Sequence, residues 1–178
     1  MNCHKTITFI WTVLCYDRRE RKVWSIERLQ KEDLRHVVRM VKTSILNKSS
    51  RFYNQEQLTA WAEGVNNHPP IHQRFLTAYS LVAKDADHKI IGFSSLVQAH
   101  IDFLYLAANR QGEGVATQLL SLLEEQAREK GVEVLTTEAS AVARPFFEKR
   151  GYAIKMEQVK WIRGISIKNV QMFKKVHK

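Results

Sequence analysis

The chain has 178 residues, enough for one domain with a core of its own. Its composition, 44% hydrophobic and 26% charged, is that of a soluble globular protein and excludes a low-complexity or disordered chain. The net charge is +10, and the surplus lies at the two ends, because residues 23–146 hold as many acidic as basic side chains. Such a surface suits nucleic acid, an acidic substrate or a polyphosphate cofactor. Basic side chains also prevent exposed edge strands from pairing with other molecules, so the charge alone does not identify a binding partner.

The first 22 residues are a separate case. Residues 7–16 form an apolar run, but no cleavage site for a signal peptidase follows it, and the run is too short to cross a bilayer. We therefore expect 1–22 to be an extra strand or arm outside the core, and 23–178 to form a single domain. The two cysteines, Cys3 and Cys15, provide neither a disulfide framework nor zinc spacing. This favours a cytoplasmic protein with no metal and no membrane association.

The apolar pattern of residues 23–97 predicts a strand, two helices and a hairpin. Residues 23–29 alternate as a strand does, and the helix that follows has an apolar face formed by Leu34, Val37, Val38, Val41 and Ile45. Asn54 and Gln57 form a capping box for a second helix, which we expect to end at Gly64. Residues 76–84 and 89–97 are predicted strands joined by a polar turn, hence an antiparallel hairpin.

Strands and helices alternate in the rest of the chain. The predicted strands are 100–107, 132–138, 152–161 and 165–176, and the predicted helices are 115–130 and 140–150. Pro145 shortens the regular part of the second of these helices. This order predicts an α/β (α+β) fold, with a mixed, mostly antiparallel twisted sheet flanked by helices.

The glycine-bearing turn before the helix at 115–130 carries the strongest functional signal. Gly112 and Gly114 let the backbone approach a ligand, and the first N–H groups of a helix have no intrahelical partner. Together with the positive end of the helix dipole, they predict an anion site, with phosphate as the expected ligand. A Walker loop is excluded because no Lys-Ser/Thr follows Gly114. The dinucleotide fingerprint is excluded because Thr117 replaces its third glycine.

The turn fits a third pattern, Gln/Arg-x-x-Gly-x-Gly/Ala, at residues 111–116. With this match the chain resembles the GCN5-related N-acetyltransferase (GNAT) superfamily, whose signature for the CoA pyrophosphate has that form. Residues 139–152 resemble the family's "Asn-x-x-Ala … Phe-Tyr-Glu-Lys-x-Gly-Phe" segment, and residues 81–96 resemble its strand-turn-strand segment. Three further pieces, 53–62, 137–147 and 164–174, resemble the YafP-type subgroup.

The resemblance implies a fold with splayed central strands and acetyl-CoA as co-substrate. The N–H groups of residues 111–116 would hold the pyrophosphate, and the backbone of Leu106 and Ala107 would pair with the pantetheine amides. The residues assigned to the cofactor in this way are Leu106, Ala107, Gln111, Gly112, Glu113, Gly114, Val115, Ala116, Ser140 and Phe147. Ser140 replaces the family's pantetheine-contacting asparagine, and Phe147 replaces the tyrosine that often serves as general acid.

Acetyl transfer needs a base for the amine and an acid for the thiolate. The catalytic candidates are Asp102, Tyr105, Glu138 and Tyr152. Alternation along the strand places Tyr105 on the face opposite Asp102. Glu138 has Arg144 as an alternative partner, and Tyr152 has an alternative role in the core. A chain of water molecules is the further alternative for moving both protons.

Two functions follow from these observations. The leading one is an acetyl-CoA-dependent N-acetyltransferase that moves an acetyl group directly to a primary amine of a small molecule or protein. The alternative is a catalytically weak or inactive CoA-binding protein, which the departures at Ser140 and Phe147 motivate. No aromatic-basic or helix-turn-helix pattern supports nucleic acid as a partner. The sequence leaves the identity of the amine open, and also whether the chain forms a homodimer.

Overall fold

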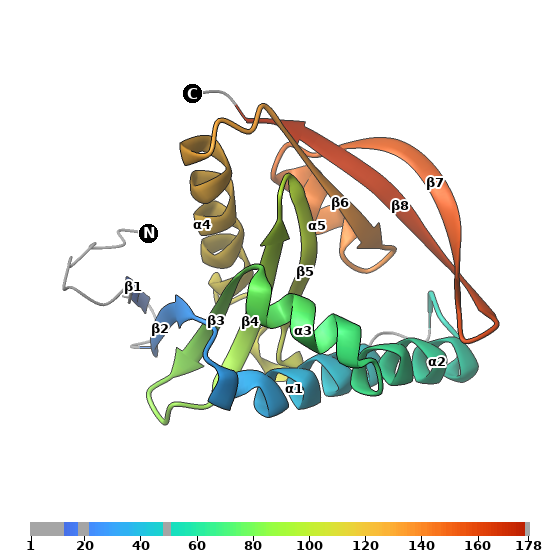
Figure 1. The fold of residues 1–178 in the computed structure, drawn as a ribbon, viewed down its shortest axis with the longest axis horizontal. Coiled ribbons are helices and arrows are strands. Elements are labelled where there is room, and N and C mark those ends of the chain that lie inside the picture. The colour runs from blue at the N-terminus through green and yellow to red at the C-terminus, as the bar shows by residue number, and fades with distance from the viewer. Residues whose placement is uncertain (1–12, 18–21, 48–50, 177–178) are drawn as a thin grey trace.

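The computed structural model describes residues 13–17, 22–47 and 51–176, in which eight strands form one sheet. The strands are β1 (Val13–Asp17), β2 (Lys22–Arg28), β3 (Tyr79–Asp85), β4 (Ile90–Val97), β5 (His100–Leu106), β6 (Val134–Ser140), β7 (Ala153–Ile162) and β8 (Ile165–Lys175). Their order in the sheet is β1-β2-β3-β4-β5-β6-β8-β7 (Figure 1). Every neighbouring pair is antiparallel except β5 and β6. The predicted mixed, mostly antiparallel α/β fold is confirmed.

Helices cover both faces of the sheet and define its two sides. The helices are α1 (Leu34–Leu46), α2 (Gln55–Asn66), α3 (Pro69–Thr77), α4 (Val115–Glu129) and α5 (Arg144–Lys149), with short 3-10 turns η1 (Lys31–Asp33) and η2 (Ala108–Arg110). One buried cluster contains Leu119 and Leu123 of α4, and the other contains Val41 of α1 and Phe75 of α3. We call these the α4 side and the α1–α3 side. No described helix is both long and apolar enough to cross a membrane.

The centre of the sheet opens between β5 and β6. These strands pair only where His100 lies opposite Thr136 and Ile101 opposite Thr137. Beyond that point β5 runs to Leu106 while β6 turns away from it (Figure 1). The expected splay of the central strands is therefore present, and it leaves strand backbone along both sides of an opening.

The predicted strand at 76–84 is wrong at its start, because α3 occupies residues up to Thr77. The two prolines after His68 fall in the first turn of this helix, where the missing N–H groups have no intrahelical partner to lose. His68 Nδ1 accepts a hydrogen bond from Ile71 N–H (3.2 Å) and caps the helix. Phe75 then packs between Phe93 and Phe103, with ring centroids 4.7 Å from each.

Gly64 does not end the second helix, as the sequence predicted, because α2 continues to Asn66. Instead Gly64 permits a close approach: a Cβ atom there would lie 2.8 Å from Ile162 Cγ2 on β7. The start of α2 is as predicted, since Asn54 Oδ1 accepts from Gln57 N–H (2.9 Å) and Asn54 N–H donates to Gln57 Oε1 (3.1 Å). The helix expected from Ser140 starts only at Arg144, with Pro145 in its first turn.

Part of the expected N-terminal arm belongs to the sheet. β1 pairs with β2 from Val13 opposite Ile26 to Asp17 opposite Lys22, and it forms one edge. Residues 1–12, with part of the apolar run 7–16, lie outside the described residues. The proposed boundary between residues 22 and 23 stays a prediction.

Candidate cofactor and acceptor site

The glycine turn connects η2 to α4 at the end of the strand opening. Gly112 has φ +82° and Gly114 has φ +87°, a left-handed region that residues with a side chain rarely adopt. Gln118 N–H donates to Gly114 O (3.0 Å), the first intrahelical bond of α4. The N–H groups of residues 115–117 precede that bond and have no intrahelical acceptor. The turn thus presents the donor set that an anion needs, as the sequence predicts.

Leu106 and Ala107, beside the glycine turn, differ in whether their backbone N–H and C=O groups face the opening. Ala107 N–H donates to Ile91 O (2.9 Å), and Ala107 O accepts from Arg110 N–H (3.0 Å). Both backbone groups of Ala107 therefore already have a hydrogen-bond partner within the chain, and its predicted pantetheine contact stays a prediction. Alternate residues of a strand direct their N–H and C=O to opposite edges, so the backbone of Leu106 points into the opening.

Phe147 and Tyr152 belong to the buried cluster on the α4 side, and Ser140 is the last residue of β6, at the end of the opening. Ser140 Oγ accepts a hydrogen bond from Ala143 N–H (3.2 Å) in the turn after β6. Phe147 is buried, and its ring meets that of Tyr152 edge-on with centroids 5.2 Å apart. The Tyr152 hydroxyl is engaged as well, because it donates to Glu124 Oε1 on α4 (3.1 Å). Burial and the neighbouring Glu124 raise the pKa of Tyr152, so the structure places this candidate acid in the core.

Asp102 lies at a β-bulge in β5. Ser95 pairs with Phe103 but Leu96 pairs with Ile101, so Asp102 is an extra residue without a partner on β4. Its carboxylate meets Arg74 on α3, with Nε 2.7 Å from Oδ2, and thus lies on the α1–α3 side. Leu106 lies on the α4 side, against Leu119. The expectation from alternation that Asp102 and Tyr105 occupy opposite faces is wrong, because the bulge shifts the alternation by one residue.

A group of ionisable side chains surrounds Asp102 at the base of the opening. Burial raises the pKa of Asp102 above its ordinary range, although Arg74 and His100 oppose this. Burial also raises the pKa of Glu138, but hydrogen bonds from Lys160 and Gln158 outweigh it and bring that pKa below its ordinary value. Glu138 therefore pairs with Lys160 rather than with Arg144, which donates to Glu148 instead (2.8 Å). Of the two carboxylates, Asp102 holds a proton more readily.

Three aromatic residues lie on the α1–α3 side near Asp102: Tyr53 just before α2, Trp61 in α2 and Tyr105 in β5. The rings of Tyr53 and Trp61 meet edge-on with centroids 5.6 Å apart, and Trp61 hydrogen-bonds to the hydroxyl of Tyr105. Burial raises the pKa of Tyr105, and the nearby charge of Asp102 acts in the same direction. Tyr53 donates to Lys168 O (3.0 Å) and accepts from Ala141 N–H (2.9 Å), so it fixes the start of α2 to β8 and to the end of β6.

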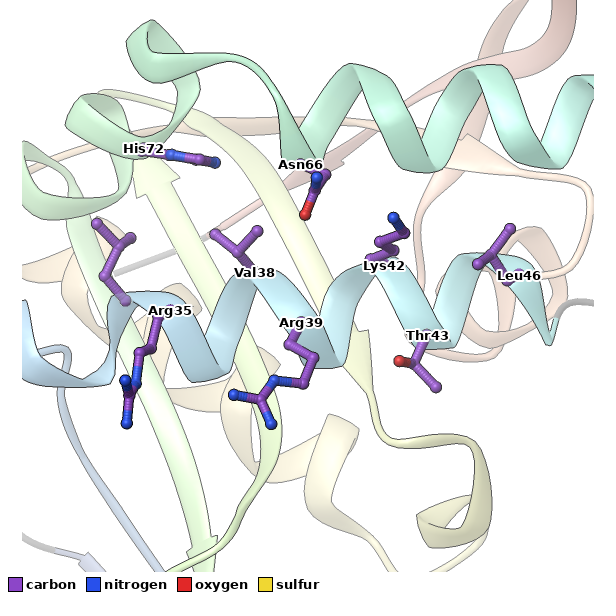
Figure 2. Close-up of a pocket in the computed structure, with 9 residues that line it drawn as sticks. Arg35, Val38, Arg39, Lys42, Thr43, Leu46, Asn66 and His72 are labelled. Carbon is purple, nitrogen blue, oxygen red and sulfur yellow. The ribbon is translucent and has the colours of Figure 1, made fainter.

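A groove of about 630 Å³ lies elsewhere, between α1 and the two following helices (Figure 2). Val38 and Lys42 point toward α2, whereas the guanidinium groups of Arg35 and Arg39 point away from it. Lys42 pairs with Glu63 (2.8 Å). The groove contains none of the residues predicted to bind or react, so it is not part of the site. Among the described residues, no three His, Cys, Asp or Glu side chains are grouped as a metal site requires.

Sequence reasoning missed two cations of the site, Arg74 and Lys160. Arg74 lies on α3, which was overlooked because the prolines at 69 and 70 suggested a break rather than a helix start. Lys160 reaches Glu138 across β8, and this contact depends on the register of three strands. A helix pattern beginning at the prolines could have located Arg74, but no local signal locates Lys160.

Comparison with known proteins identifies the same fold and family. The acetyltransferase (GNAT) domain family matches residues 50–174. The uncharacterized N-acetyltransferase YafP of Escherichia coli (strain K12) is 26% identical over 147 residues, which cover 83% of this chain and 93% of that protein. A GCN5-related N-acetyltransferase from Rhodopseudomonas palustris superposes with a TM-score of 0.79 at 31% identity, over 84% of this chain and 94% of its own. The expected resemblance to the GNAT superfamily and to YafP is confirmed.

A more distant solved structure carries the cofactor. It is the PaiA N-acetyltransferase from Thermoplasma acidophilum in complex with coenzyme A, with a TM-score of 0.62 at 21% identity. The match covers 85% of this chain and 98% of that one. At this identity the likeness shows the shared fold, with a known CoA-binding protein among its members.

Proposed function

Because the chain belongs to the acetyltransferase (GNAT) domain family, we propose that it moves an acetyl group from acetyl-CoA directly to a primary amine of a small molecule or protein. The observation that carries the proposal is the opening between β5 and β6 with the glycine turn at its end. The turn offers N–H groups to a pyrophosphate, and the backbone of Leu106 offers hydrogen bonds to a pantetheine amide. Acetyl-CoA complements both features.

Direct transfer requires a neutral amine beside the thioester. An alkylamine has a pKa of about 10.4, so deprotonation at pH 7 costs roughly 5 kcal/mol. A positioned base and partial desolvation can supply this, and placement of the reactants can supply on the order of 7 kcal/mol more. We assign the base to Asp102, because its raised pKa is better matched to neutral pH than the lowered pKa of Glu138.

The candidates for the acid that protonates the departing thiolate are the two tyrosines, Tyr105 and Tyr152. Phe147 has no hydroxyl, and the hydroxyl of Tyr152 is bound to Glu124 within the core. Tyr105 is the remaining phenol among the candidates, and it lies on the same side as Asp102. We therefore assign the proton for the thiolate to Tyr105 or to water held beside it.

Two measurements test this proposal. Calorimetry with acetyl-CoA reports binding, and a thiol-release assay with polyamines, aminoglycosides, amino acids and peptides reports transfer. Gly114→Ala should weaken acetyl-CoA binding about five- to thirtyfold, because a Cβ at φ +87° costs about 1–2 kcal/mol and distorts the turn. Gly131→Ala is the matched control: Gly131 has φ +72° at the other end of α4, so it should lose comparable stability without losing binding.

The outcomes separate the two functions. Turnover with any amine, lost in Gly114→Ala and kept in Gly131→Ala, supports the acetyltransferase. Binding of acetyl-CoA without turnover across the panel supports the alternative, a CoA-binding protein with little activity, for which Phe147 and Ser140 are the specific observations. Absence of binding contradicts both.

A further inference from the structure

Asp85 occupies the end of β3, at the turn that leads into β4. Its Oδ1 atom accepts hydrogen bonds from Asp87 N–H (3.2 Å) and Lys89 N–H (3.0 Å), which fixes the side chain against the turn. Its Oδ2 atom accepts a hydrogen bond from Arg110 Nη2 (2.6 Å). The Asp85 side chain is only 11% exposed. One carboxylate thus binds its own turn with one oxygen and a distant arginine with the other.

Arg110 directly precedes the glycine turn, at the end of η2. Besides Asp85, it approaches Glu113, with Nη1 3.6 Å from Oε2. Glu113 stands between Gly112 and Gly114 and is itself only 10% exposed. The guanidinium therefore lies between two largely buried carboxylates, one on the β3–β4 turn and one inside the glycine turn.

The glycine turn needs such a restraint. Its two glycines lose more conformational freedom on ordering than other residues do. Packing does not hold it at Gly112, where an added Cβ would meet no atom within 4 Å. An anion site works only when its N–H groups already converge on one point, so order in the turn translates into affinity.

We propose that Asp85 is a positioning residue for acetyl-CoA binding, which acts by holding Arg110, and through it Glu113, so that the glycine turn is preset for the pyrophosphate. The inference rests on the function proposed above. Asp85 is not itself a ligand, because a carboxylate repels the phosphates that the turn receives. It acts through the geometry of a charge-assisted hydrogen bond, which is directional and short.

Three variants and one control test the inference by calorimetry with acetyl-CoA. Asp85→Asn keeps Oδ1 for the turn and replaces Oδ2 with a donor that cannot bind Arg110, and Arg110→Gln removes the guanidinium. Each should raise the Kd at least about tenfold, the scale of one hydrogen bond to a charged group. The double variant should bind no more weakly than either single variant, within about twofold, because both act through one contact.

Lys84→Gln is the matched control. Lys84 is the neighbouring residue, is similarly buried, and pairs with Glu27 and Asp33 away from the glycine turn. Its loss should lower Tm at least as much as Asp85→Asn does, yet leave the Kd within about twofold. A shift in Kd without an excess shift in Tm distinguishes positioning of the turn from general loss of structure.

Three results would overturn the inference while the proposed function stands: an unchanged Kd in Asp85→Asn, independent losses that multiply in the double variant, or an equal loss in Lys84→Gln. A wild-type chain that does not bind acetyl-CoA would instead overturn the proposed function, and this inference with it.

Discussion

The sequence assigns Tyr152 either a catalytic role or a role in the core, and replacing it with phenylalanine distinguishes the two. The substitution removes only the hydroxyl, which donates to Glu124 Oε1 (3.1 Å). The ring stays, with its edge-on contact to Phe147 and the Lys174 ammonium 5.5 Å from its centroid. Lys174 also donates to the same oxygen of Glu124 (2.9 Å), so that carboxylate keeps a partner.

The size of the effect follows from these contacts. Tyr152 and Glu124 are 3% and 9% exposed, so water does not replace the lost hydrogen bond. A hydrogen bond to a charged group contributes about 1.5–3 kcal/mol, and the remaining Lys174 contact places the loss at the lower end, at about 1.5 kcal/mol. For a chain of this length, 1 kcal/mol corresponds to about 2–4 °C in Tm. We therefore expect Tyr152→Phe to lower Tm by about 3–6 °C.

Thermal unfolding and the thiol-release assay together check this prediction. Tyr79→Phe is the control, since Tyr79 is a half-buried tyrosine whose ring lies 4.2 Å from the Arg28 guanidinium and whose hydroxyl has no hydrogen-bond partner among the described residues. It should change stability by less than about 0.5 kcal/mol. Turnover of Tyr152→Phe at a temperature well below its Tm should equal that of the wild type. A loss of turnover of tenfold or more at unchanged Tm would refute the assignment of Tyr152 to the core.

The remaining predictions concern the acceptor side and α2. Asp102→Asn should lower turnover about 10²–10⁴-fold and remove the acidic limb of the pH profile, which burial of Asp102 places above the pKa of an ordinary aspartate. Glu138→Gln, whose carboxylate is already ionised at that pH, should leave this limb in place; a limb that moves with Glu138 instead would contradict the choice of base. Tyr53→Phe leaves the part-buried carbonyl of Lys168 and N–H of Ala141 without their partner and should cost about 1–2 kcal/mol in urea unfolding. Gly64→Ala should destabilise by about 1–3 kcal/mol through its clash with Ile162, despite the better helix propensity of alanine, and a second change Ile162→Ala should recover part of the loss.

Local signals in the sequence were sufficient for most elements of the fold. The capping box of Asn54 and Gln57 has the predicted geometry, because its two hydrogen bonds join residues three apart. The same holds for Gly151, which follows α5 with φ +84°. Gly64 shows where this reasoning fails. Its role depends on Ile162, which is nearly a hundred residues away in the chain. The sequence alone does not distinguish a glycine required for close packing from a glycine that ends a helix.

The candidate site also has one part that local sequence signals predict and one part that they do not. The position of the glycine turn is a local property, since its two left-handed glycines and the N–H groups without an intrahelical acceptor lie within residues 111–117, and the sequence located it. The contact from Asp85 that we propose to hold the turn is not local, and the sequence did not indicate it. The part of the site around Asp102 and Tyr105 depends on the register between β4 and β5. Asp102 faces Arg74 only because a bulge adds one residue to β5 opposite Ser95 and Leu96, and no residue type in that stretch requires a bulge. Side chains of a regular strand do alternate between faces, but β5 is not regular at Asp102.

The two departures from the family pattern are consistent with one another in this structure. Where the family has an asparagine, Ser140 binds the backbone of its own turn, and Tyr53 takes up the next N–H at Ala141. Where the family has a tyrosine, Phe147 packs on Tyr152, whose hydroxyl is held by α4. Both side chains thus make contacts within the protein at the end of the opening, and their predicted contacts with the cofactor stay predictions. Under the proposed function, we expect binding to depend mainly on backbone groups of the glycine turn and of Leu106, and proton transfer to depend on the side of β5 that carries Asp102 and Tyr105. The rate should therefore respond to the bulge at Asp102 far more than to any substitution in α5.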